Sequence, residues 1–373
     1  MKSVLSRLVH FTKPSVKPSI VAGAIVLAAC HASHPTVSPM PDLAADVDAV
    51  MRSYALPGAP GASVLIVRDG HTVLARLYGL SDVERNTAAT AQTNYRLASL
   101  TKQFTATAIM LLKEQGRLSY DDPVAMYLPT LPPIARTVTI RMLLTHTSGL
   151  PAYEDFVPDS QTTQVHDADV PSLIAHADTG YFAPGADYRY SNTGYALLAL
   201  VIERVSGEPF AKFLRARIFS PLGMTGTVAH EAGISTVTQR AVGYTIESGR
   251  VSPRDQSATS AVLGDGGVYS SIDDLAKWDA ALDAHTLVSE ADQREAWTSA
   301  TTTRGARVGY GFGWFVDSTS DGVRLRHHGE TSGFTNAILK IPARRLTIVI
   351  LTNRAGGAPW DLASRIAGLS ALR

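Results

Sequence analysis

The chain has 373 residues, of which 45% are hydrophobic and 18% charged, a composition that excludes a disordered or fibrous protein. Its formal net charge is +1 and no lysine- or arginine-rich face is visible, which argues against nucleic-acid binding. The single cysteine, Cys30, excludes an internal disulfide framework and any metal site that needs several cysteines. The length indicates two domains or one large composite domain.

The first 29 residues have the pattern of an export signal. Four basic residues and no acidic one accompany an apolar run over 20–29, which is too short to span a membrane. The run ends Leu-Ala-Ala-Cys30, which resembles the lipobox of bacterial lipoproteins, so Cys30 is expected to become the lipidated first residue. Ordinary signal-peptidase cleavage after Ala32 is the alternative.

Removal of residues 1–29 lowers the formal net charge from +1 to −3. We therefore expect an exported, periplasmic protein that meets the membrane through a lipid anchor. Histidine rather than aspartate at position 31 favours the outer membrane. Residues 30–41, rich in proline and serine from His34 onward, are expected to form an extended tether.

The mature chain opens with a helix and a hairpin. The helix is expected over 42–54, because a breaker cluster of proline and glycine follows at 57–61. Two apolar runs, 62–68 and 72–78, flank Asp69-Gly70, and this dipeptide between such runs is a strong hairpin signal.

The middle of the chain is mainly helical. The apolar spacing predicts helices over 99–115, 140–144, 170–177, 193–205 and 210–218. The polar, proline-containing stretch 153–169 is expected to be a long loop.

The chain ends with a second hairpin and a helix. Residues 334–341 and 346–352 flank a turn at 342–345, and the apolar run 347–351 predicts a strand buried on both faces. A helix is expected over 361–372. Strands at both ends with helices between them predict an α/β sheet domain, 42–96 with 260–373, and an inserted, mainly helical domain, 97–259.

Ser99-Leu-Thr-Lys102 is the most informative motif. On a helix, positions three apart stack on one face, so the Ser99 hydroxyl and the Lys102 ammonium would be neighbours. A serine hydroxyl needs a base to become a nucleophile, and a buried lysine with a depressed pKa can serve. Taken alone, a solvated helix start with an ordinary lysine is the more frequent explanation of S-x-x-K.

Tyr190-Ser-Asn192 precedes an apolar helix. Positions two apart in extended chain point the same way, so Tyr190 and Asn192 could converge on one site. A phenol beside a lysine can relay a proton, and an amide can fix both the lysine and a substrate carbonyl. The alternative is that Asn192 caps the helix and Tyr190 packs in the core.

His327-His328-Gly329-Glu330 leads into the C-terminal hairpin. Side chains alternate along a strand, so only one of the two histidines can face a cleft, which argues against a metal site. Gly329 would let substrate approach an edge strand, and the Glu330 N–H could act as an oxyanion donor together with that of Ser99. A surface strand with two solvated histidines is the alternative.

The order S-x-x-K, Y-x-N, H-x-G resembles the superfamily of class C β-lactamases, penicillin-binding DD-peptidases and family VIII esterases. The resemblance extends over about 42–353 and includes the stretches 143–151 and 264–270. It implies a β-lactamase/transpeptidase-like fold, an antiparallel sheet flanked by helices with an inserted helical domain. It further implies Ser99 as the acylated nucleophile and Lys102 with Tyr190 as the proton-handling pair.

The same resemblance implies Asn192 as a polar bridge, His327 at the third-motif position and the Ser99 and Glu330 amides as oxyanion hole. The third motif begins with histidine where efficient β-lactamases have lysine. A histidine is mostly neutral near pH 7, so strong β-lactamase activity is disfavoured and esters or D-amino-acid amides are favoured. Glu330 adds a charge that would further disfavour anionic substrates if its side chain faces the cleft.

Other hydrolase machinery is absent from the sequence. There is no G-x-S-x-G elbow, no H-E-x-x-H helix and no nucleotide-binding loop. His146 could suggest a triad with Ser99, but its place at the end of a short helix before Ser-Gly favours a structural turn.

The sequence thus predicts a lipid-anchored serine hydrolase that acts on ester or amide bonds through an acyl-enzyme and uses no metal or organic cofactor. A penicillin-recognising sensor or cell-wall-binding lipoprotein with slow or no turnover is the alternative. A DD-carboxypeptidase acting on a peptidoglycan stem peptide is a third hypothesis.

Overall fold

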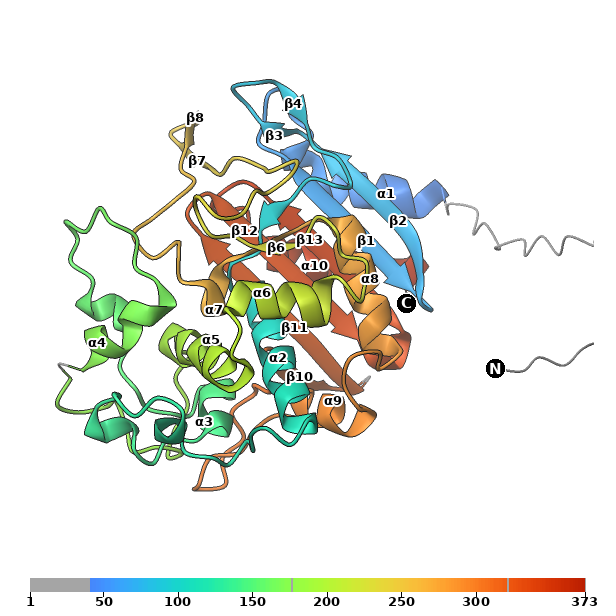
Figure 1. Cartoon of the computed structure of the whole chain (residues 1–373). Coiled ribbons are helices and arrows are strands. Elements are labelled where there is room, and N and C mark those ends of the chain that lie inside the picture. The colour runs from blue at the N-terminus through green and yellow to red at the C-terminus, as the bar shows by residue number, and fades with distance from the viewer. Residues whose placement is uncertain (1–40, 176, 321, 373) are drawn as a thin grey trace, which may run out of the picture. The chain divides into compact units, whose positions relative to one another are not determined.

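A six-stranded antiparallel sheet holds the two ends of the folded chain together (Figure 1). The computed structural model describes residues 41–175, 177–320 and 322–372, so the expectations for residues 1–40, Cys30 among them, lie outside it. The strand order is β10-β11-β12-β13-β1-β2. Its strands are β1 (Ala62–Arg68), β2 (His71–Tyr78), β10 (Phe315–Thr319), β11 (Gly322–Thr331), β12 (Phe334–Ile341) and β13 (Leu346–Thr352).

Both predicted hairpins are present at the predicted residues. Asp69 and Gly70 have φ of 53° and 76°, and two left-handed residues are what a tight hairpin between twisted strands requires. β12 and β13 are joined by a 3₁₀ turn, Pro342–Arg344, followed by Arg345 with φ of 47°. β1 and β13, two interior strands of the sheet, pair along their whole length.

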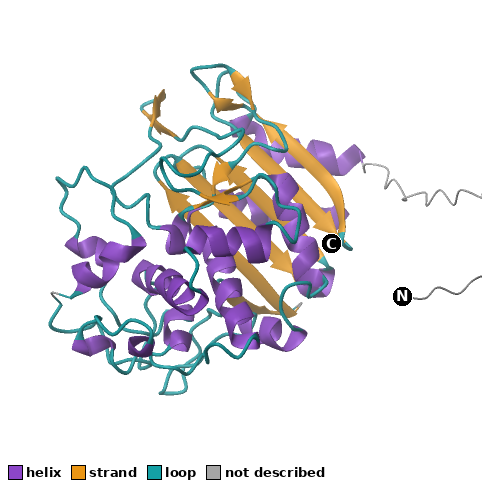
Figure 2. Cartoon of the chain, viewed as in Figure 1, coloured by secondary structure: helices purple, strands orange, loops and turns teal. Residues whose placement is uncertain are grey.

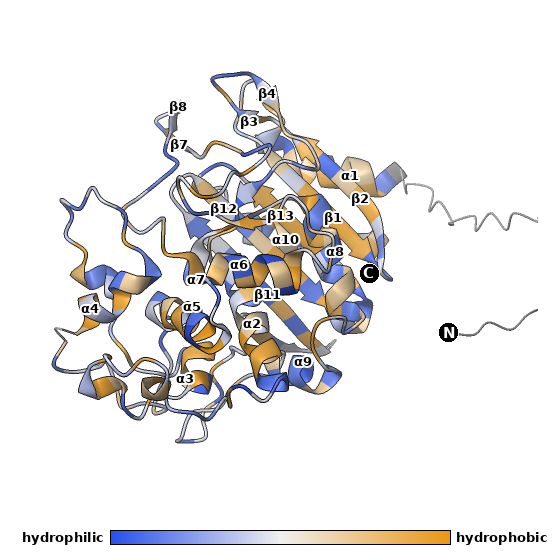
Figure 3. Cartoon of the chain, in the orientation of Figure 1, coloured by the Kyte–Doolittle hydropathy of each residue, from blue (hydrophilic) through white to orange (hydrophobic). Residues whose placement is uncertain are grey.

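The sheet separates two hydrophobic cores. Along β1, Val64 and Ile66 face helices α1 (Pro41–Met51) and α10 (Pro359–Ala367), whereas Leu65 and Val67 face the helices of the middle of the chain. β13 is buried at all seven positions, as its unbroken apolar sequence predicts. Burial on both faces requires apolar residues, and the interior strands of the sheet are accordingly largely coloured as hydrophobic in Figure 3.

The remaining helices lie on the face of the sheet opposite α1 and α10, or beyond the edge of that face (Figure 2). They are α2 (Lys102–Glu114), α3 (Ile140–Leu144), α4 (Val170–Ile174), α5 (Asn192–Ser206), α6 (Phe210–Leu214), α7 (Leu263–Gly266), α8 (Ile272–Asp283) and α9 (Glu290–Ala296). Short strands form small sheets outside the main one: β3 (Leu80–Asp82), β4 (Thr87–Ala88), β5 (Tyr95–Arg96), β6 (Val228–Ala229), β7 (Tyr244–Glu247), β8 (Arg250–Pro253) and β9 (Val268–Ser270).

The helix predictions hold in type and differ at the ends. The segment 99–115 begins with a 3₁₀ turn, Ala98–Thr101, before α2, and 210–218 ends in a π-helical turn, Arg215–Phe219. The stretch 153–169 is loop apart from 3₁₀ turns at Tyr153–Phe156 and Asp167–Asp169. Pro41, placed in the tether from sequence, is the first residue of α1. The boundaries of the two proposed domains stay a prediction.

Across residues 41–372, apart from the undescribed positions 176 and 321, no helix combines the length and the apolar content needed to cross a bilayer.

Candidate active site

Ser99 lies in a strained turn at the start of α2. The 3₁₀ turn Ala98–Thr101 follows β5, and the buried Ala98 has φ of 50°, a left-handed conformation that is rare for a residue with a Cβ. Such strain persists only where the surroundings enforce it, and it is concentrated at functional sites. The turn presents the Ser99 hydroxyl beside the first residue of α2, Lys102.

Lys102 is fully buried and its amine contacts three oxygen atoms. Nζ lies 2.9 Å from Ser99 Oγ, 2.8 Å from Asn192 Oδ1 and 2.9 Å from the main-chain oxygen of Asp265. Burial lowers the pKa of Lys102 to about 8, although the charges of Asp265 and Glu154 oppose the shift. A substantial fraction of this amine is therefore neutral at mildly alkaline pH.

Tyr190 covers the same amine. Lys102 Nζ lies 5.0 Å from the centroid of the Tyr190 ring, and the tyrosine precedes α5 by two residues. Burial strongly raises the pKa of the Tyr190 phenol, and its contact with Ser99 opposes that rise only in part. The phenol is thus protonated near neutral pH. The structure therefore brings Ser99, Lys102 and Tyr190 together, as the motif order predicts.

Asn192 joins this group from the first turn of α5. It is the first helical residue rather than an extended one, and Ser191 occupies the N-cap position, so the expectation of two parallel extended side chains was wrong in detail. The Asn192 amide nevertheless reaches Lys102, because its Nδ2 donates to Glu154 Oε1 at 2.7 Å and its Oδ1 is turned to the amine. The capping alternative does not describe this side chain.

His327 is the buried histidine of the third motif. It is 1% exposed on β11, while His328 points to the exposed side. Its Nδ1 lies 2.8 Å from the His328 main-chain oxygen, which can only accept, so Nδ1 carries the proton and Nε2 accepts from Tyr310 Oη at 2.9 Å. Burial and the charge of Lys102 hold its pKa well below the usual value, so this imidazole is neutral.

Gly329 allows a close approach between β11 and the turn that carries Ser99. A Cβ at Gly329 would lie 2.1 Å from the Leu97 main-chain oxygen, so the glycine lets β11 press against the turn that carries Ser99. β10 pairs with β11 only as far as Arg326, which leaves residues 327–331 without a strand on that side. Alternation places the Glu330 side chain on the face opposite His327, and Glu330 lines the same cavity as Ser99.

A small polar cavity of about 90 Å³ opens at Ser99. Tyr153, Glu154 and Asp265 contribute to it, and the sequence assigned no role to them. Tyr153 Oη donates to Asp265 Oδ2 at 3.1 Å, and burial raises the pKa of Asp265 to about 7. The cavity is lined by Arg96, Ala98, Ser99, Tyr153, Glu154, Asn192, Thr259, Asp265, Gly266, Glu330 and Thr331.

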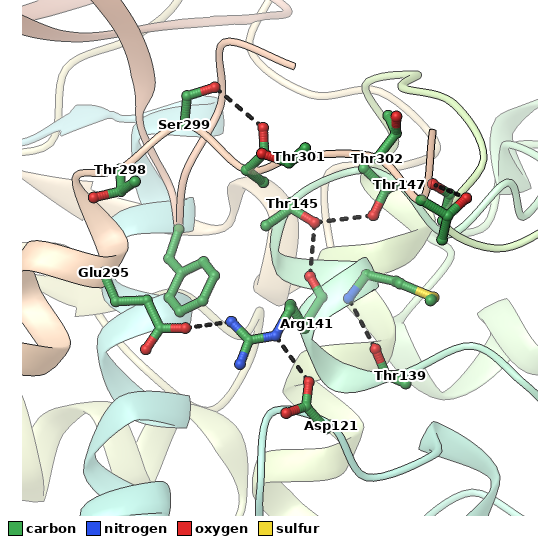
Figure 4. Close-up of a pocket in the computed structure, with 15 residues that line it drawn as sticks. Asp121, Thr139, Arg141, Thr145, Thr147, Glu295, Thr298, Ser299, Thr301 and Thr302 are labelled. Carbon is green, nitrogen blue, oxygen red and sulfur yellow. Dashed lines mark hydrogen bonds and ion pairs between the residues drawn. The ribbon is translucent and has the colours of Figure 1, made fainter. Parts of the chain in front are cut away.

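A separate cavity of about 410 Å³ lies away from Ser99 (Figure 4). It is rich in threonine, and Arg141 bridges Asp121 and Glu295 across its floor. No residue of the S-x-x-K, Y-x-N and H-x-G motifs lines it. Within the described parts of the chain, no group of three or more His, Cys, Asp or Glu side chains could hold a metal ion.

His146 lies close to the site but is not bonded to Ser99. It has φ of 59° in the turn after α3, and its Nδ1 accepts from the Ser191 N–H at 3.2 Å. The geometry gives no Ser-His-Asp triad with Ser99.

The family assignment follows from comparison with known proteins. The family model described as Beta-lactamase matches residues 46–372. The chain belongs to this beta-lactamase family. It is 33% identical over 316 residues to penicillin-binding protein 4* of Bacillus subtilis, and the match covers 81% of this chain and 70% of that protein.

Solved structures of the beta-lactamase family share the fold. The octameric penicillin-binding protein homologue from Pyrococcus abyssi superimposes with a TM-score of 0.75 at 30% identity, covering 89% of this chain and 76% of the other. A D-stereospecific amidohydrolase from Streptomyces gives a TM-score of 0.70 at 25% identity, with 88% and 98% covered. The β-lactamase/transpeptidase-like fold is thereby confirmed, and the chain is a serine hydrolase of this family.

Proposed function

We propose that this enzyme cleaves carboxylic ester or amide bonds through an acyl-enzyme on Ser99. The arrangement around Lys102 carries the proposal. Asn192 Oδ1 and the Asp265 carbonyl can only accept hydrogen bonds, so a neutral Lys102 amine donates its two hydrogens to them. Its lone pair is then left for the third neighbour, the Ser99 hydroxyl.

In the proposed reaction Ser99 Oγ attacks the substrate carbonyl while its proton passes to Lys102. The Ser99 and Glu330 main-chain N–H groups receive the developing negative oxygen. The departing alcohol or amine takes a proton from the Lys102–Tyr190 pair, in which the buried phenol is the protonated partner. A water molecule, activated by the same pair, then releases the acid and returns Ser99 to its starting state.

The neutral His327 supports a preference for esters and D-amino-acid amides over β-lactams. An ammonium at the third motif would attract a substrate carboxylate, and a buried histidine with a lowered pKa offers no such charge. Similarity to the Streptomyces D-stereospecific amidohydrolase supports the amide side of the proposal. A peptidoglycan stem peptide is a candidate natural substrate, and the export pattern ending at Cys30 supports a periplasmic, lipid-anchored enzyme.

A substrate panel with a Ser99→Ala control tests the function. Wild-type protein is expected to release p-nitrophenol steadily from a short-chain p-nitrophenyl ester, to hydrolyse D-alanine p-nitroanilide and to turn over a chromogenic cephalosporin poorly. Ser99→Ala should fold and lose all of these activities. Retained ester hydrolysis in Ser99→Ala would overturn the proposal. A fluorophosphonate label on Ser99 without product release would instead favour the slowly reacting sensor.

A further inference from the structure

The buried Nε2 of His146, beside the proposed catalytic residues, has no hydrogen-bond partner among the described residues. The Tyr190 hydroxyl has a place in the reaction proposed above, whereas His146 has none. A buried imidazole next to the reacting groups therefore needs its own explanation.

His146 holds the main chain on both sides of Tyr190. The Arg189 N–H donates to the His146 main-chain oxygen at 3.0 Å, and the Ser191 N–H donates to His146 Nδ1 at 3.2 Å. Tyr190 precedes α5 and lies outside regular structure, so these two bonds determine how its segment passes the site.

The His146 ring also supports the phenol directly. Its centroid lies 4.3 Å from that of the Tyr190 ring, with the planes inclined by 38°, and 4.4 Å from that of Tyr310. Three other aromatic rings lie around Tyr190, with centroids 6.0 to 6.1 Å from that of its ring: Tyr310, Phe315 and His327. His146 is thus the closest of these rings to the phenol that covers Lys102.

The chemistry of this imidazole suits support rather than proton transfer. A main-chain N–H can only donate, so Nδ1 is unprotonated and the single proton of the neutral ring is on Nε2. Burial and the charge of the nearby Lys102 hold the pKa of His146 well below its usual value. The remaining groups that pack against it, Tyr188, Tyr190, Tyr195 and Tyr310, are phenols.

We propose that His146 is a positioning residue for Tyr190: its backbone, Nδ1 and ring face together fix the phenol over Lys102. The left-handed backbone at 59° restricts the choice of residue, since asparagine, aspartate, histidine and glycine tolerate it best. Of these, only histidine combines an acceptor in this place with an aromatic face. The inference rests on the function proposed for Ser99, Lys102 and Tyr190.

Three substitutions separate the components of this role. His146→Phe keeps a ring but removes the acceptor, His146→Asn keeps an acceptor and the left-handed preference but removes the ring, and His146→Ala removes both. Ester kcat is expected to fall about 10- to 100-fold in the Phe and Ala variants, with KM changed less than about threefold, because the phenol is misplaced. His146→Asn should keep more activity than either.

The pH profile distinguishes positioning from a merely structural role. kcat/KM should rise with pH as Lys102 loses its proton, and this rise is the Lys102 limb of the pH profile. In the Phe and Ala variants the limb should move to higher pH, because a displaced Tyr190 no longer buries the amine. The matched control is His285→Ala: His285 is exposed and has φ of 51°, so the substitution tests the backbone strain alone and should leave kcat and the limb unchanged.

Two results would overturn the proposal. One is wild-type kcat and an unmoved limb in His146→Phe and His146→Ala. The other is an activity loss that only follows the folded fraction, measured by circular dichroism, with the limb unmoved. Ser99→Ala in the same assay keeps the hypotheses apart: activity there refutes the proposed function, whereas an inactive Ser99→Ala with normal His146 variants refutes positioning alone.

Discussion

Lys102 Nζ and Asn192 Oδ1 lie 2.8 Å apart, and Glu154 determines which end of the Asn192 amide faces the amine. Glu154 Oε1 accepts from Asn192 Nδ2 at 2.7 Å, and because a carboxylate oxygen accepts from an amide nitrogen, the amide oxygen is left for Lys102. A residue from the loop after α3 thereby orients the partner of the proposed base.

This relationship predicts the behaviour of Asn192→Asp. The substitution places a carboxylate against Lys102 and opposite Glu154, which stabilises the charged amine and raises its pKa. We expect kcat/KM near neutral pH to fall about 100-fold and to recover partly at alkaline pH. A pH series of ester hydrolysis measures this, with Asp155→Asn, a charge change at an exposed neighbour of Glu154, as control. A pH dependence of kcat/KM in Asn192→Asp that does not shift relative to the wild type would contradict the role of Lys102 as the base.

The activity of the wild-type enzyme should depend on pH through Lys102. The neutral form of Lys102 is the base, and its share rises as pH passes the pKa of about 8, so kcat/KM should increase through this region and level off above it. His146 and His327, whose pKa values burial holds well below the usual value, should add no histidine limb near neutral pH. Activity that declines from pH 7 to 9 would exclude Lys102 as the base.

The parts of the fold that the sequence predicts well are local ones. A tight hairpin turn requires two left-handed residues, which Asp69 and Gly70 supply, and the β12–β13 boundaries follow from an apolar run broken by a turn. The spacing of Ser99 and Lys102 is also local, because one helical turn brings the two side chains together.

The parts that the sequence could not give are long-range contacts. Glu154 meets Asn192 across 38 positions, and the Asp265 main chain meets Lys102 across 163. No periodicity encodes such distances. Asp265 lies inside a stretch that carries the family resemblance, and Glu154 lies three residues after the end of another, so proximity to these motifs is the available signal. The strain at Ala98 has no sequence signature, since alanine does not favour positive φ.

Gly329→Ala should damage the site through that strained turn. The added Cβ meets the Leu97 main-chain oxygen at 2.1 Å, and a main-chain atom cannot move aside without moving Ala98 and Ser99. We expect a loss of about 1 to 3 kcal/mol in the free energy of unfolding, as for other overpacked sites. We also expect kcat to fall by more than about tenfold.

Urea unfolding and ester kinetics measure the two effects of Gly329→Ala. Gly368→Ala is the control, because Gly368 has φ of −83° and its added Cβ would come no closer than 3.3 Å to the atoms around it. Equal, small effects in both variants would show that close approach of β11 to the Ser99 turn is unnecessary.

The buried ion pair between β12 and α8 predicts a stability change without a catalytic one. Lys340 is 2% exposed, and its Nζ lies 2.8 Å from Oδ1 of Asp279, which is 1% exposed. Thr347 Oγ1 donates to the same oxygen at 2.7 Å. Lys340→Ala leaves this carboxylate buried without its cation, which costs about 3 to 5 kcal/mol in the free energy of unfolding.

The double variant Lys340→Met with Asp279→Leu separates the charge from the packing. It removes the two buried ions and keeps the apolar volume, and it leaves only Asp283, the partly exposed second partner of Lys340 at 2.6 Å, so it should recover most of the stability lost in Lys340→Ala. Ester kcat of the folded protein should stay at the wild-type value in all these variants, because neither residue lines the cavity at Ser99. Thermal unfolding and kcat measured on the same samples test this. A double variant as unstable as Lys340→Ala would mean that the ions themselves, rather than the filling of the space, hold α8 on the sheet.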